Sequence, residues 1–158
     1  MSIRHQIIRS FDIESHELRV VLSSFFLVFL LMTSYYMLRP VRDSMASEWT
    51  DIEVSWLWTF TFLFSVIAIS LYGFIASRVR LDYLIPGSYI FFALSFLTFY
   101  FASDVEVLSR FSDKAFYVWV SVYALFHISV FWILMSETFS KAQAKRLFGF
   151  IGAGASVG

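Results

Sequence analysis

Four long apolar runs divide the chain, and charged residues stand almost only between them. No Asp, Glu, Lys or Arg lies within residues 20–38, 54–77, 83–103 or 115–136. These runs contain about 19 to 24 residues each, and a helix needs about 20 to cross the hydrocarbon core of a bilayer. The pattern therefore predicts transmembrane helices at about 18–38, 54–77, 83–103 and 115–136.

A fifth apolar run opens at Leu147 and reaches Gly158. It is too short for a crossing, so we expect residues 147–158 to begin a fifth helix of an incomplete bundle. The missing helices would then follow in a C-terminal part of the same protein. Residues 1–17 are expected to form a cytoplasmic N-terminal segment, as either a short interfacial helix or a solvated tail.

The expected fold class is an all-α polytopic membrane protein. Backbone groups in lipid must be bonded within a helix or a closed barrel, and the alternation of barrel strands is absent here. The chain is 59% hydrophobic, against about 45–50% in soluble domains. We expect a multi-pass integral membrane protein that has the lipid bilayer as its partner.

Charge and composition exclude several other classes. The net charge is zero, so nothing attracts nucleic acid in bulk and no nucleic-acid partner is expected. The absence of Cys rules out disulfides and thiolate chemistry. We find no metal-ligand spacing, no P-loop and no nucleophile–base pair, and therefore expect neither a metal, a cofactor nor an enzyme.

The distribution of Lys and Arg predicts the orientation. Eight of these residues precede the first run, separate runs two and three, or follow run four, which places them on one side of the membrane: Arg4, Arg9, Arg19, Arg78, Arg80, Lys141, Lys145 and Arg146. The other side has four, mixed with acidic residues. Cytoplasmic loops carry the excess of Lys and Arg, so the N-terminus is expected in the cytoplasm.

The stretch SYYMLRPVRDSM closes the first run with Arg39, Arg42 and Asp43. Two lipid-facing arginines at mid-bilayer would cost about 5–7 kcal/mol, so these side chains either lie at the interface or face a water-filled cavity. Pro40 is predicted to break or kink the helix and to force extended backbone before it. A second helical piece starting there would present free amides beside two guanidinium groups, which is an anion site.

Two further sets of residues follow from run four. His127 is its one ionisable residue, and it is either a satisfied polar residue between helices or part of a cavity. Glu137, Lys145 and Arg146 are expected in a solvated cytoplasmic link after helix four. Glu137 and Lys141 are four apart, in the order that favours a helical ion pair.

The segment FGFIGAGASVG contains Gly152, Gly154 and Gly158 and superficially resembles a dinucleotide-binding turn. That turn requires a surrounding βαβ unit, whereas here four apolar runs precede it. Gly154 and Gly158 instead form a small-xxx-small pair, which predicts close packing of helices.

Two patches of the sequence resemble the bacterial and plastid ATP/ADP antiporter family, which is related to the major facilitator fold. The first patch is Arg39, Arg42 and Asp43, late in the first helix. The second begins within the last part of the fourth run and comprises Phe131, Trp132, Ser136, Glu137, Ala144, Lys145, Arg146, Leu147, Phe148 and Gly149. Gly73, Arg78, Arg80 and Asp82 similarly resemble the major facilitator loop between helices two and three.

The resemblance implies the N-terminal fragment of a major facilitator-type bundle in a bacterial inner membrane. It implies a transporter that moves nucleotides, by ATP/ADP-type exchange, or a related phosphorylated anion by alternating access. Arg42 would contact the substrate, with Arg39 nearby and Asp43 orienting the pair; His127 is a further substrate-binding candidate. A facilitator for another solute, a non-transporting membrane scaffold and a membrane enzyme completed by the C-terminal part remain as alternatives.

Overall fold

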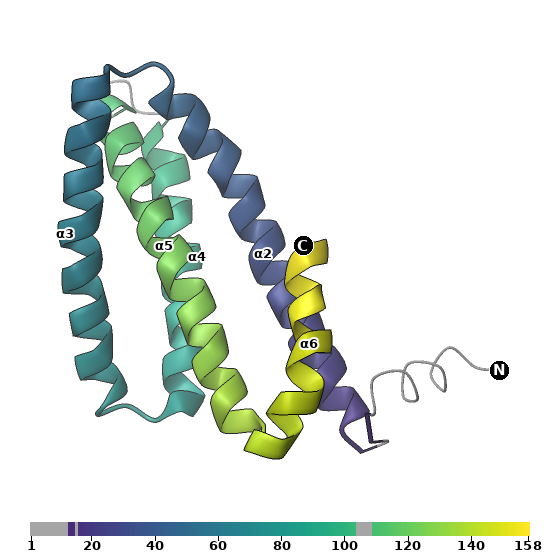
Figure 1. Cartoon of the computed structure of the whole chain (residues 1–158). Helices are drawn as coiled ribbons and strands as arrows, with labels where there is room; N and C mark the ends of the chain where they lie inside the picture. The colour runs from purple at the N-terminus through teal and green to yellow at the C-terminus, as the bar shows by residue number, and fades with distance from the viewer. Residues whose placement is uncertain (1–12, 15, 104–108) are drawn as a thin grey trace. The chain divides into compact units, whose positions relative to one another are not determined.

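The computed structural model describes residues 13, 14, 16–103 and 109–158, and every regular element in these ranges is an α-helix (Figure 1). The five helices are α2 (Leu18–Ala46), α3 (Asp51–Ala76), α4 (Leu81–Ser103), α5 (Ser109–Thr138) and α6 (Lys141–Val157). The predicted all-α class is confirmed for this part of the chain. The two predicted alternatives for the N-terminal segment concern mainly residues 1–12, outside the described ranges.

Helices α2 to α5 are each long and apolar enough to cross a membrane, which is typical of a multi-pass membrane protein. Their surfaces agree with this property. Large apolar side chains are exposed along α3, among them Ile52, Trp56, Phe60, Phe62 and Ile67. Soluble monomers rarely expose continuous apolar surface of this extent, whereas lipid tails cover it without cost.

Helix α2 differs from its prediction because it runs through Pro40 to Ala46. The predicted break, the extended backbone before Pro40 and the second helical piece were wrong. Proline removes one backbone hydrogen bond, but transmembrane helices tolerate it because neighbouring groups satisfy what it leaves. The amides after Pro40 therefore belong to a continuous helix and do not form a free N-terminus for an anion.

Helix α6 begins six residues earlier than the apolar run predicted, at Lys141 instead of Leu147. Its start is fixed by a capping box. The Ser140 side chain accepts a hydrogen bond from the Gln143 amide, and the Gln143 side chain accepts one from the Ser140 amide. This reciprocal pair satisfies two amides that a helix N-terminus otherwise leaves unbonded. A matching box of Thr50 and Glu53 starts α3.

The described chain forms two compact units. Unit 1 comprises Met1–Tyr36 and Phe131–Gly158, and unit 2 comprises Met37–Val130. In unit 1, α6 lies beside the first half of α2 (Figure 1). The buried residues on these two helices recur every three or four positions, which is the spacing of one helix face: Val21, Ser24, Val28 and Leu31 on α2, and Leu147, Ile151 and Gly154 on α6.

Close approach of α6 to α2 depends on glycine. A Cβ on Gly154 would lie 2.6 Å from the backbone oxygen of Phe25, and one on Gly158 would overlap the backbone oxygen of Phe29. The predicted packing role of this small-residue pair is confirmed.

Unit 2 contains the last part of α2, all of α3 and α4, and most of α5. An aromatic cluster holds α4 to α5, with the Phe92 ring centroid 5.6 Å from that of Trp119 and 5.2 Å from that of Tyr123. The Trp119 indole N–H donates to the Ser95 hydroxyl at 2.7 Å. Offset and edge-on ring pairs of this kind contribute beyond their buried area, so they fix the register of these helices.

Candidate functional site

The predicted residues Arg39, Arg42 and Asp43 come together in unit 2. The Arg42 Nε and Nη2 both donate to Asp43 Oδ1, at 2.9 and 2.7 Å. The Arg39 Nε lies 3.6 Å from Asp43 Oδ2, one helical turn away. Asp43 thus contacts both guanidinium groups, through a different oxygen for each.

Helix α5 supplies the other side of this site. The Arg42 Nη1 donates to the Ser121 hydroxyl at 3.3 Å, and the guanidinium carbon lies 5.4 Å from the centre of the Tyr117 ring. These five residues, Arg39, Arg42, Asp43, Tyr117 and Ser121, are called the Arg42 cluster below. Two positive charges against one negative leave it a net charge of +1.

The depth of the cluster follows from α5. Ser121 lies six residues inside the uncharged run 115–136, which is about 9 Å along a helix. The Arg42 side chain is only 17% exposed, against 49% for Arg39. A cation at membrane depth needs polar partners, and Arg42 finds them in Asp43 and Ser121.

Three aromatic residues, Trp49, Trp58 and Tyr117, adjoin the cluster and are called the aromatic wall below. The Trp58 indole N–H donates to the Tyr117 hydroxyl at 2.9 Å, and the Trp49 ring centre lies 5.7 Å from that of Tyr117.

Sequence reasoning missed Tyr117 and Ser121 as site residues. The readable signal was their spacing of four within an apolar run, which puts both polar tips on one helix face.

A second ion pair lies at the same end of unit 2. The Lys114 ammonium lies 2.7 Å from Glu53 Oε1. Both side chains are about two-fifths exposed, and each neutralises the other. This pair joins α5 to the first turn of α3 and does not change the net charge of the Arg42 cluster.

His127 is not brought to the Arg42 cluster. It follows Ser121 by six residues on α5, about 9 Å further along the axis and about a third of a turn round the helix. Its side chain is buried, its Nδ1 lies 2.8 Å from the backbone oxygen of Tyr123, and the two rings stack at 4.8 Å. This geometry matches a packed helix-face histidine; substrate binding by His127 stays a prediction.

The residues predicted for a solvated link after helix four separate in the structure. Glu137 lies in the last turn of α5, whereas Lys145 and Arg146 lie inside α6. Glu137 and Lys141 belong to different helices, so the expected helical pair between them is wrong. Lys145 is exposed, but the Arg146 side chain is only 22% exposed and is not part of a solvated link.

Arg146 binds Glu17 in unit 1, a contact that sequence reasoning missed. Its Nη2 donates to both carboxylate oxygens of Glu17 at 2.8 Å, and the Gln143 amide donates to Oε1 at 2.7 Å. The hydrogen bond from Gln143 holds the pKa of the Glu17 carboxyl below its ordinary value, and the Glu14 amide and the Arg146 charge act in the same direction against burial. Glu17 is therefore an ionised, buried anchor for α6.

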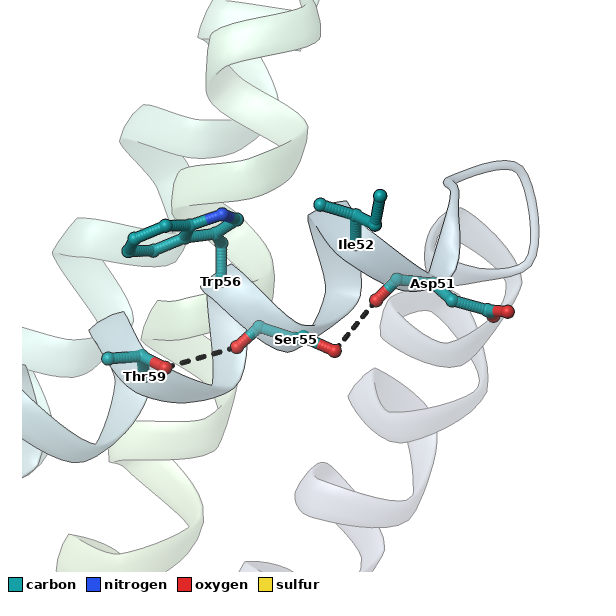
Figure 2. A pocket seen from close by; sticks show the side chains of 5 residues that line it. All are labelled: Asp51, Ile52, Ser55, Trp56 and Thr59. Atoms are coloured by element: carbon teal, nitrogen blue, oxygen red, sulfur yellow. Dashed lines mark hydrogen bonds between the residues drawn. The ribbon is translucent and has the colours of Figure 1, made fainter.

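A hollow of about 330 Å³ lies on one face of α3, lined by Asp51, Ile52, Ser55, Trp56 and Thr59 (Figure 2). Both of its hydroxyls are already bonded within the helix. Ser55 donates to the Asp51 backbone oxygen at 2.8 Å, and Thr59 donates to that of Ser55 at 3.2 Å. The hollow thus offers few polar groups to a ligand.

Comparisons with protein-family models, with curated proteins and with solved structures found no match to this chain. The family resemblance accordingly rests on the sequence patches around Arg42 and after residue 131. Within the described ranges, no group of three or more His, Asp or Glu side chains is arranged to hold a metal ion.

Proposed function

We propose that this chain is the N-terminal part of a membrane transporter that moves nucleotides, or a related phosphorylated anion, by alternating access. The observation that carries the proposal is the position of Arg42. Its guanidinium is largely covered at membrane depth by Asp43, Ser121 and Tyr117. Ionisable groups held in this way mark substrate pathways in membrane proteins.

The hydrogen bonds of Arg42 leave some of its N–H donors for an anion. An arginine has five N–H donors, and the contacts with Asp43 and Ser121 engage three of them. A phosphate group would take up the remaining two and would also meet the positive charge of Arg39. Paired N–H groups in a planar fork match phosphate oxygens closely, and the net charge of +1 favours an anionic substrate.

The aromatic wall favours a nucleotide over a simple inorganic anion. The Tyr117 ring contacts both the Arg42 guanidinium and the Trp49 ring, and its hydroxyl accepts a hydrogen bond from the Trp58 indole. Bases stack on aromatic side chains with about 1–3 kcal/mol per base. A phosphate on Arg42 would leave a nucleoside within reach of these rings.

Binding of labelled ATP and ADP to the detergent-solubilised chain tests this proposal. We expect saturable binding that falls at least tenfold in Arg42→Gln and less in Arg42→Lys, which keeps the charge but loses the fork. Arg19→Gln is the matched control, because Arg19 is an exposed arginine of α2 outside the cluster. Equal nucleotide affinity in wild type and Arg42→Gln would remove Arg42 from the site.

The alternatives give different results in the same assay. A facilitator for another solute predicts no nucleotide binding, together with saturable binding of a different labelled solute. A non-transporting scaffold predicts no saturable binding of any small anion. Competition with pyrophosphate distinguishes two modes of nucleotide recognition. Pyrophosphate would abolish nucleotide binding that depends on the phosphates and would leave unaffected nucleotide binding that depends on the aromatic wall.

A further inference from the structure

A second cavity, distinct from the Arg42 cluster, lies in unit 2 between α3, α4 and α5. It encloses about 590 Å³, and no Asp, Glu, Lys or Arg lines it. Its walls are mostly aromatic and aliphatic, and they include Phe64, Ile75, Phe91, Trp119 and Phe126. This cavity is called the apolar groove below.

Of the three hydroxyl groups on residues that line the groove, that of Ser88 is bonded within its own helix and that of Tyr72 is buried, whereas Tyr83 is exposed. The Ser88 hydroxyl donates to the Leu84 backbone oxygen at 2.7 Å. The Tyr72 hydroxyl is fully buried within the protein and has no hydrogen-bond partner in the described part of the chain. The groove therefore presents a hydrocarbon surface, and its occupant along most of its length must be apolar.

The groove has the length of one membrane leaflet. Its α3 wall runs from Phe64 to Ile75, and the lining continues with Val79 in the turn before α4 and with Tyr83 in the first turn of α4. Eleven residues of helix rise about 16 Å, and half of the hydrocarbon core is about 15 Å thick. With the charged α3–α4 turn at the membrane surface, a groove of this length would reach about mid-bilayer.

Positive charge marks the end of the groove at the turn. Arg78 and Arg80 flank the lining residue Val79. The Arg80 Nη2 donates to Asp82 at 2.9 Å, whereas Arg78 lies over the Phe74 ring at 3.8 Å and has no carboxylate partner among the described residues. Two cations against one carboxylate leave the mouth of the groove with a net charge of +1.

We propose that the apolar groove binds one acyl chain of an anionic phospholipid, whose headgroup lies at Arg78 and Arg80. The uncharged wall suits an apolar acyl chain, and the length of the wall matches the length of an acyl chain within one leaflet. The cations at the turn complement an anionic headgroup. A basic pocket between helices at the membrane surface is a recognised type of headgroup site. The site is separate from the proposed transport function and holds whatever the substrate proves to be.

Gly87 provides a direct test because it lines the groove and a Cβ there would meet no atom within 4 Å. Gly87→Leu therefore fills the groove without disturbing the backbone. Gly73→Leu is the matched control, since Gly73 also has open space around it but does not line the groove. Native mass spectrometry of the chain in detergent, titrated with phosphatidylglycerol or phosphatidylcholine, counts the lipids retained.

We expect one phosphatidylglycerol per wild-type chain and at least tenfold weaker retention in Gly87→Leu, with Gly73→Leu unchanged. The double variant Arg78→Gln, Arg80→Gln should retain phosphatidylglycerol and phosphatidylcholine equally. Ala68→Leu fills the same groove from α3 and serves as the test if Gly87→Leu fails to fold.

Undiminished lipid retention in both groove variants would overturn the proposal, and so would dimers of the wild type that retain no lipid. Equal wild-type affinity for both lipids would overturn its headgroup half.

Discussion

The Arg146 guanidinium lies 2.8 Å from both carboxylate oxygens of Glu17 and ties α6 to the residue immediately before α2. The two partners are not equally buried: the Glu17 side chain is 4% exposed and that of Arg146 is 22% exposed. Loss of the arginine therefore strands a buried charge, whereas loss of the carboxylate leaves an arginine that can reach water.

This asymmetry gives the first prediction. Removing one partner of a buried ion pair destabilises a protein by about 3–5 kcal/mol. We therefore expect Arg146→Met to lower the free energy of unfolding by about 3 kcal/mol, and Glu17→Gln to lower it by less. Lys145→Met is the control, because Lys145 is exposed on the same helix turn. Unfolding midpoints in mixed micelles measure the effect. An equal loss in Arg146→Met and Lys145→Met would show that the pair does not anchor α6.

The second prediction concerns pH. The pKa of Glu17 in the folded chain lies below the ordinary value of 4.5, first because of the hydrogen bond from Gln143. A group with a lowered folded pKa binds more protons when unfolded, so its contribution is complete above 4.5 and is lost as pH falls through the folded pKa. Stability of unit 1 should therefore decline below pH 4.5, and Glu17→Gln should flatten that decline. An unchanged acid profile in Glu17→Gln would refute the linkage.

The third prediction tests the contact of α6 with α2. Gly154→Ala would put a methyl group 2.6 Å from the Phe25 backbone oxygen, and a helix backbone cannot yield as a side chain does. Overpacking of this kind costs about 1–3 kcal/mol. Gly152→Ala is the matched control, since a Cβ there meets nothing within 4 Å. This variant should be neutral or slightly stabilising. Thermal unfolding followed by circular dichroism compares the two; similar midpoints would contradict the close approach.

Much of this architecture was predictable from the sequence, for reasons that particular residues make clear. The uncharged runs predicted α2 to α5, because membrane solvation acts on each helix locally. The start of α6 was missed, although the Ser140–Gln143 capping box is readable from its spacing. The continuation of α2 through Pro40 was not readable, because the rule that proline ends a helix is relaxed where neighbouring groups satisfy the freed backbone. The contact of Arg42 with Ser121 was not readable because the two residues are 79 positions apart in the sequence. The Glu17–Arg146 pair was hidden for the same reason.

The fourth prediction compares the buried Ser65 with the half-buried Ser95. The Ser65 hydroxyl is buried without a hydrogen-bond partner in the described ranges, whereas the Ser95 hydroxyl accepts from the Trp119 indole and donates to the Phe92 backbone oxygen. An unsatisfied buried polar group is unfavourable by about 1–3 kcal/mol. Ser65→Ala should therefore raise the unfolding midpoint and Ser95→Ala should lower it. A fall in both would mean that Ser65 has a partner.

The fifth prediction concerns the orientation of the chain in the membrane and is based on the distribution of Lys and Arg. The chain has no Cys, so single substitutions give clean labels. Ser77→Cys, at the end of α3, should react with an impermeant maleimide only from the cytoplasmic side. Ser47→Cys, before the start of α3, should react only from outside. The reverse pattern in intact cells would invert the proposed topology.

The contact of Gly154 with the Phe25 backbone has a consequence for biosynthesis. The two strips of sequence that form unit 1 are separated by the whole of unit 2. At about 5–20 residues per second, a ribosome needs about 5–20 s to pass from the end of α2 to the start of α6. During that interval the narrow strip of α2 that receives Gly154 faces lipid or the insertion machinery. Helix α2 thus gains this neighbour only after α3, α4 and α5 have been synthesised.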